Sequence, residues 1–80
     1  MVYVYVEKFK IGASVRVAEK PFLEDFRTRW KWHHPLQEEQ VGCAGAVSKV
    51  KTVGFYHGGD VIYTLEGLPG IWHEECLNAV

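Results

Sequence analysis

The stretch from Gly54 to Leu77 constrains the fold of this chain more than any other part of the sequence. Residues 57–60 read His-Gly-Gly-Asp between two apolar runs, and paired glycines permit the positive φ angles of a tight hairpin turn. Residues 60–66 then alternate between two faces, which predicts a half-buried strand. The face expected to be buried carries Val61, Tyr63 and Leu65.

A second turn signal, Gly67–Gly70, follows this strand and includes a proline. The next segment, residues 71–77, contains Trp72 and is too short for an independent helix. It predicts one tight helical turn before the C-terminus.

Three more stretches complete the predicted sheet. Residues 2–6 alternate Val and Tyr, so both faces of this strand are apolar, and we expect it to pair with a sheet edge or to join two copies in a homo-oligomer. Residues 9–17 predict a second strand, and residues 42–53 predict a third that bends at Gly45. The side chains expected in the core from these last two strands are Val15, Val17 and Val47.

Residues 18–41 keep neither the strand period nor the helix period for long. Pro21 and Pro35 lack the amide hydrogen that a sheet ladder needs. We therefore expect a long irregular loop, with one or two helical turns between Phe22 and Trp30. The whole pattern predicts an all-β fold in a single domain spanning residues 1–80.

This order of strands, loop and turns resembles the SH3-like small β-barrels. The resemblance implies a single SH3-like barrel of five to six strands, with a long irregular loop and a short C-terminal helical turn. Within that group, three features look distantly like the β-subunit barrel of nitrile hydratases. They are Gly12–Val17, Gly42–Val47 and the series His57, Tyr63, Trp72 and Leu77. The metal-binding cysteine cluster of those enzymes belongs to their other subunit, so the resemblance implies no catalytic activity here.

Composition limits the function classes. Nine Lys and Arg against ten Asp and Glu give a formal net charge of −1, which supplies no long-range attraction for a polyanion or a membrane surface. Two cysteines are too few for a disulfide framework, and no basic segment precedes an apolar region, so we expect a cytoplasmic protein. No apolar run approaches the roughly 20 residues that span a bilayer, which predicts solubility.

Aromatic and histidine side chains form the predicted ligand-binding face, between the long loop, the hairpin and the C-terminal turn. The residues expected to line it are Trp30, Trp32, His33, His34, Tyr56, His57 and Trp72. Exposed aromatics gathered on one face are typical of interface hot spots. The sequence therefore favours a non-catalytic binding or protein-interaction module that contacts a protein or a small ligand.

Two other functions stay open. The stretch 26–34 interleaves Arg27, Arg29 and Lys31 with aromatic residues, a pattern typical of single-stranded nucleic-acid binding, which we expect to be weak and sensitive to salt. The second alternative is a small enzyme or oligomer subunit whose site is completed by another chain.

Metal binding and catalysis have weaker support. His73 and Cys76 are three residues apart and could share one face of a helical turn, but the second ligand pair would have to be the adjacent His33 and His34. Acid–base or nucleophilic pairs would have to combine His57 or His73 with Glu74, Glu75 or Cys76. We therefore assign no catalytic residue, metal or cofactor.

Overall fold

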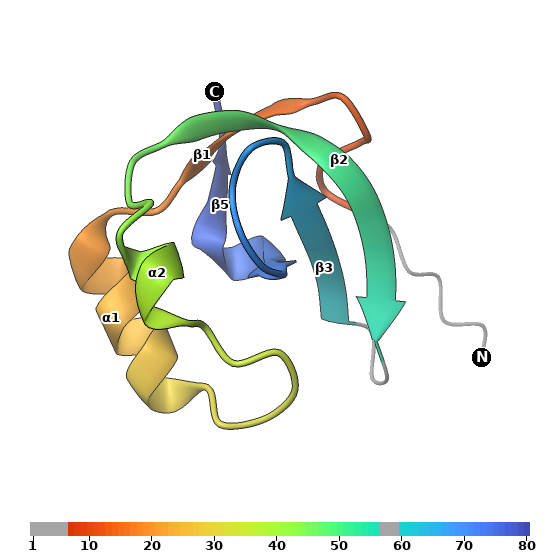
Figure 1. Ribbon diagram of the computed structural model, residues 1–80. Coiled ribbons are helices and arrows are strands. Elements are labelled where there is room, and N and C mark those ends of the chain that lie inside the picture. Colours follow the sequence, from red (N-terminus) through yellow and green to blue (C-terminus); the bar gives the residue numbers. More distant parts are fainter. Residues whose placement is uncertain (1–6, 57–59) are drawn as a thin grey trace.

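Five antiparallel strands form one open sheet in the computed structural model, which describes residues 7–56 and 60–80. The strands are β1 (Ser14–Val17), β2 (Val47–Tyr56), β3 (Asp60–Leu65), β4 (Trp72–His73) and β5 (Leu77–Ala79). They lie in the order β4-β3-β2-β1-β5. Two α-helices, α1 (Lys20–Arg29) and α2 (Glu38–Val41), and a 3₁₀ helix, η1 (Glu74–Cys76), complete the fold (Figure 1).

The long strand β2 organises the sheet. Its first residues pair with β1 and the rest pair with β3, and the register shifts between Val50 and Thr52. Such an irregularity increases local twist and bends the strand. Figure 1 accordingly shows β2 arching over the molecule. The two edge strands, β4 and β5, are consecutive in the chain and joined only by η1, so the sheet must curve enough to bring its edges close together.

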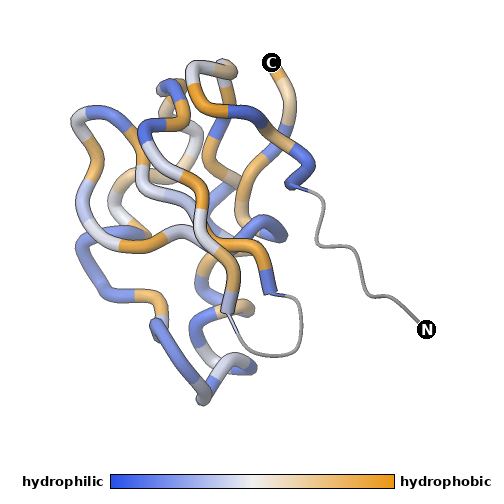
Figure 2. Tube along the Cα trace, turned by 90° about the vertical axis from the view of Figure 1, so that its right-hand side faces the viewer, coloured by the Kyte–Doolittle hydropathy of each residue, from blue (hydrophilic) through white to orange (hydrophobic). Residues whose placement is uncertain are grey.

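The core lies inside this curved sheet, and the sequence predicts much of it. Val15 and Val17 are fully buried, and Arg16 between them is exposed, as the alternation predicts. Tyr63 and Leu65 are likewise buried. Hydropathy changes in short steps along the chain, as expected for strands with one buried face (Figure 2). The remaining buried apolar residues include Phe9, Leu23, Phe26, Leu36, Val41, Val50, Trp72, Cys76 and Leu77.

The prediction that Val47 lies in the core was wrong, because its side chain is 54% exposed at the start of β2. The strand expected from residue 42 begins only at Val47, since residues 42–45 form turns and Gly45 has a φ of 78°. Gly45 thus ends the turn before β2 instead of bending a continuous strand. The prediction of a special backbone position at Gly45 was confirmed, but the prediction of a bend within a strand was wrong.

The prediction of a long irregular loop over residues 18–41 with one or two helical turns was wrong in the extent of its helical part. Ten of these residues form α1, which packs against α2 and η1. Pro21 lies in the first turn of α1, where the missing amide hydrogen costs no helical hydrogen bond. In α2 the side chains of Gln37 and Gln40 form a reciprocal capping box. The irregular residues of this stretch are 18–19, before α1, and 30–37, between the two helices.

Two predicted features fall wholly or partly outside the described residues. The N-terminal strand at residues 2–6 lies outside them, as do residues 57–59 of the hairpin turn. The strands that flank this turn are described, and Tyr56 pairs with Asp60 in an antiparallel ladder, which confirms the hairpin. The predicted C-terminal helical turn is η1. Within residues 7–56 and 60–80, no helix is long and apolar enough to cross a membrane.

Candidate binding surface

The end of α1 positions the first residue of the candidate site. Phe26 lies in the last turn of this helix and is buried against the core. The helix stops at Trp30, whose backbone is extended and whose N–H donates to the carbonyl of Phe26. The two rings stack with centroids 5.5 Å apart and an interplanar angle of 13°. The helix end therefore fixes Trp30 at the border between core and surface.

Around Trp30 lies a group of rings from four parts of the chain, which we call the ring cluster. It consists of Phe26, Trp30, Trp32, His33, His34, Tyr56 and His73. The centroids of the contacting rings are 3.7 to 5.6 Å apart. The closest contact is the stack of His33 on Tyr56, with an interplanar angle of 21°. Five of the seven residues predicted to line the site are thus brought together.

Three hydrogen bonds hold the loop of residues 30–37 in place. Trp30 donates from Nε1 to the carbonyl of His33 over 2.7 Å. His73 on β4 donates from Nε2 to the carbonyl of His34 over 2.8 Å, because a carbonyl oxygen can only accept. The third bond joins His33 Nε2 to a carboxylate oxygen of Asp60 on β3, also over 2.8 Å. The loop is therefore fastened to two strands as well as to itself.

Exposure divides the aromatic residues of the predicted face. Trp32 is 66% exposed and Tyr56 is exposed, whereas Trp30 is half-buried. Trp72 is fully buried in β4, so its assignment to the ligand-binding face was wrong. The structure does not describe His57, so its assignment stays a prediction.

The rings of Trp30 and Trp32 contact each other although the two residues are separated by only one residue. If the segment were a strand, two residues separated by one would point to opposite faces. The segment is irregular, and the two indole rings meet edge to face with centroids 4.9 Å apart. The exposed indole therefore rests on the half-buried one.

A small cavity opens beside Trp30, with a volume of about 140 Å³. It is lined by Trp30, Asp60, Val61, His73, Glu74 and Glu75. The sequence pattern assigns Asp60 to no site, and it assigns His73 only to metal binding or catalysis. Asp60 comes to the cavity because it opens β3, and His73 because it pairs with Ile62 of β3. That cross-strand register left no signal in the sequence.

Burial shifts the pKa of two titratable groups in and next to the cavity lining. Burial lowers the pKa of His73 below its ordinary value and raises that of the Cys76 thiol to about 12. A thiol with so high a pKa stays protonated at neutral pH and is a poor nucleophile. Among the described residues, no group of three or more His, Cys, Asp or Glu could hold a metal ion.

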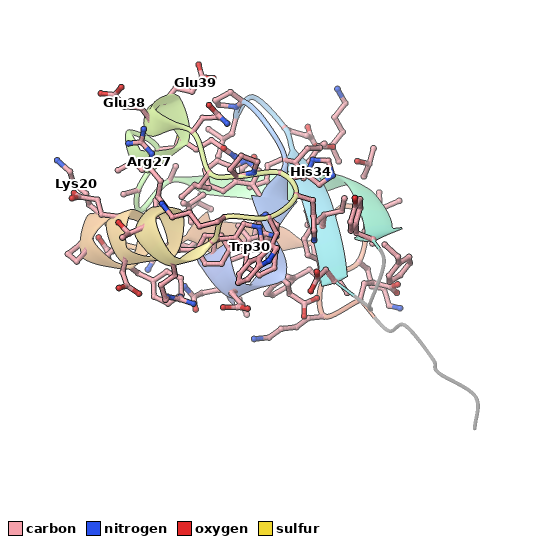
Figure 3. All side chains as sticks on the ribbon, turned by 90° about the horizontal axis from the view of Figure 1, so that it is seen from below. Lys20, Arg27, Trp30, His34, Glu38 and Glu39 are labelled. Carbon is pink, nitrogen blue, oxygen red and sulfur yellow. The ribbon has the colours of Figure 1, made fainter. Side chains whose placement is uncertain are left out.

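Two of the three cations of the nucleic-acid alternative, Arg27 and Arg29, lie beside acidic side chains. Arg29 donates from Nε to Asp25 over 2.8 Å. Arg27 lines a separate cavity of about 560 Å³ between α1 and α2, where Glu24 and Glu38 also lie. Figure 3 shows Arg27 toward the helical end of the molecule, whereas Trp30 and His34 lie nearer the strands. Lys31 is exposed in the loop.

Comparison of the chain with protein-family models, with curated proteins and with solved structures finds no match. The resemblance to SH3-like barrels therefore stays a prediction from the order of sequence features. The function has to be argued from the ring cluster and from the cavity beside it.

Proposed function

We propose that this chain is a non-catalytic binding module that contacts a protein or small ligand through the outer side of the ring cluster. The observation that carries the proposal is the position of Trp32. Its side chain is 66% exposed, although its ring packs edge to face on Trp30. A large aromatic side chain held at the surface by a buried neighbour supplies contact area at a small cost in conformational entropy.

The support beneath Trp32 adds to this argument. Trp30 stacks on Phe26 of α1 and hydrogen-bonds the carbonyl of His33, while His33 stacks on Tyr56 of β2. The exposed rings therefore rest on a helix and a strand. A binding surface built on such elements needs little rearrangement when a ligand arrives.

We also propose that the curved sheet belongs to an SH3-like barrel. The strand order and the three-residue η1 between the edge strands β4 and β5 support this proposal. In this reading, the loop of residues 30–37 and the β2–β3 hairpin lie at the same side of the barrel, since His33 contacts both Tyr56 and Asp60.

The observations favour this function over the two alternatives. Single-stranded nucleic acid needs cations free to neutralise phosphates, but Arg29 is paired with Asp25 and Arg27 lies beside two glutamates. Nucleophilic catalysis by Cys76 would need a thiolate, but burial raises the pKa of this thiol to about 12 and keeps it protonated.

Selection from a random peptide library on the immobilised domain tests the proposal, with the affinities of the enriched peptides then measured by calorimetry. We expect Trp32→Ala to weaken these peptides about tenfold or more, as for a hot-spot residue. Ile11→Ala is the matched control, because Ile11 is 69% exposed and lies outside the ring cluster. Peptides that bind wild type and Trp32→Ala equally well would refute the assignment of the surface.

A further inference from the structure

We infer that the cavity beside Trp30 binds an alkylammonium group of the ligand, such as the side chain of a lysine. This inference rests on the proposed function, because the cavity adjoins the ring cluster and shares Trp30 and His73 with it. The inference names the chemical class of one group of the ligand, which the aromatic residues of the surface alone do not specify.

Among the described residues, no lysine or arginine forms a salt bridge with the carboxylates of the cavity. These carboxylates are Asp60, Glu74 and Glu75, which line it together. The partners of Glu74 are neutral, namely the hydroxyl of Tyr63 at 2.5 Å and the backbone N–H of Lys8 at 2.9 Å. The negative charge of the cavity is therefore left for a cation from outside.

The basic groups nearby do not cancel this charge. Asp60 is bonded to His33, which is charged only when protonated. Arg29 interacts with Glu75 through charge alone, because its hydrogen bond goes to Asp25. A cationic ligand would therefore meet carboxylates whose interactions are mostly with neutral donors.

The walls of the cavity suit an ammonium group. Tryptophan has the ring that attracts cations best, and Trp30 forms one wall. Another wall is His73, which is 4% exposed and donates its Nε2 hydrogen to the carbonyl of His34. When the ring is neutral, its Nδ1 must carry a lone pair. Burial lowers the pKa of His73, which favours this neutral form.

The second ring nitrogen of His73, a residue of the cavity lining, is unpaired among the described residues. Within residues 7–56 and 60–80, Nδ1 of His73 has no hydrogen-bond partner. The side-chain atoms there that are both unpaired and fully buried are Nδ1 of His33 and Nε1 of Trp72, and Nδ1 of His73 is not among them. The Nδ1 atom of His73 therefore keeps accessible surface, although the residue as a whole is buried. An ammonium N–H donor satisfies such an acceptor.

Size and ligand type favour ammonium over a metal ion. The volume of about 140 Å³ exceeds that of a single water molecule, about 30 Å³ in the liquid, and accommodates a methylated or unmethylated ammonium head. Among the described residues, no group of three or more His, Cys, Asp or Glu is placed so that it could hold a metal ion. The aromatic wall adds attraction for an alkylated cation that a hydrated metal ion would not use.

Titration of the full chain with n-butylammonium chloride, followed by ¹H–¹⁵N NMR, tests this inference. We expect the indole N–H of Trp30 and the backbone amides of His73 and Glu75 to shift. Sodium chloride at equal ionic strength and n-butanol should leave these signals in place. A second titration with the peptide Gly-Gly-Lys-Gly-Gly separates the sources, since tighter binding of the peptide assigns the site to a lysine of a polypeptide and equal binding to a free amine.

Two variants sharpen the test. Glu75→Gln removes an exposed carboxylate of the cavity and should weaken butylammonium binding about threefold, the scale of one exposed charge interaction. Glu24→Gln makes the same change beside α2 and should have no effect. Equal shifts with n-butanol, no shifts with butylammonium, or equal affinity in Glu75→Gln and wild type would each overturn the inference.

The inference and the proposed function can fail separately. Peptides that require Trp32 while butylammonium leaves the cavity signals unmoved would overturn the ammonium site alone. Conversely, butylammonium binding that is weakened in Glu75→Gln, together with peptides whose affinity does not depend on Trp32, would support the cavity site and refute the wider surface.

Discussion

Trp72 and Trp32 are the same residue type in opposite environments. Trp72 lies in β4, pairs with Tyr63 of β3 and is fully buried. Trp32 lies in the irregular segment after α1 and is 66% exposed. Since the side chains are identical, their positions in the fold decide that one stabilises the core and the other is available to a ligand.

The two regions also differ in what holds them. Around Trp72, ladder hydrogen bonds and the buried side chains of β1, β3 and η1 fix the structure. Around Trp32, stacked rings and three side-chain hydrogen bonds replace the ladder. A core of this kind tolerates little change in volume, whereas a surface group can be truncated at small cost.

The largest expected effect is at Tyr63, the strand partner of Trp72. Tyr63→Ala should lower the free energy of unfolding by about 3–5 kcal/mol, because it removes a ring that is 1% exposed. Tyr63→Phe keeps the ring and loses only the hydroxyl, which donates to Glu74 and accepts from the N–H of Phe9. It should cost about 1–3 kcal/mol. Denaturant unfolding measures both, and equal small losses would break the distinction between the core and the ring cluster.

The next effect is at the turn that leads into β4. Gly70 has a φ of 80°, and an added Cβ would lie 2.8 Å from Nε2 of Gln40. Gln40 is buried and links Gln37 to the carbonyl of Ile71. Gly70→Ala should therefore cost about 2–4 kcal/mol, from left-handed strain and from displaced hydrogen bonds.

Gly67→Ala is the matched control for that substitution. Gly67 has a similar φ of 74°, but an added Cβ would meet nothing within 4 Å. It should show the strain alone, about 1–2 kcal/mol. Equal losses in the two variants would mean that the contact with Gln40 contributes nothing.

Sequence reasoning recovered the two strands with the cleanest alternation. Val15 and Val17 in β1, and Tyr63 and Leu65 in β3, are buried as predicted. The sequence predicted only one or two helical turns between Phe22 and Trp30, because Pro21 was interpreted only as evidence against a strand, although proline at the first turn is compatible with a longer helix. The spacing of apolar residues alone cannot show whether a proline interrupts a strand or lies in the first turn of a helix.

The candidate site was predicted in part. Trp30, Trp32, His33, His34 and Tyr56 do come together. Their arrangement depends on a positive φ of 47° at His34 and on a β3–β4 register that places His73 opposite Ile62. Neither the register nor a strained non-glycine residue leaves a local pattern, so the cavity could not be found from the sequence.

A smaller effect tests His73, which belongs to both regions. Its pKa is lowered in the folded chain, chiefly by burial, so the unfolded chain binds the proton more readily. Its contribution to stability is therefore present above the ordinary pKa of about 6.5 and is lost as pH falls below it. The titratable groups that face it, His33, His34 and Asp60, remain in every variant compared.

Unfolding measured from pH 7.5 to 5 checks this dependence. His73→Gln can still donate to the carbonyl of His34 but does not titrate, so its stability should fall less steeply with decreasing pH than that of wild type. Parallel curves would show that His73 keeps its ordinary pKa and is accessible to protons in the folded state.

The smallest effect on stability is expected where the effect on binding is largest. Trp32→Ala should change the free energy of unfolding by no more than about 0.5 kcal/mol, because most of this side chain is already in water. Trp30→Ala should cost more, since that ring is half-buried and contacts Phe26, Trp32, His33 and His73. Thermal unfolding of the two variants compares them directly. If Trp32→Ala proved as destabilising as Trp30→Ala, the exposed ring would contribute to the stability of the fold. Its exposure would then no longer support the proposed binding surface.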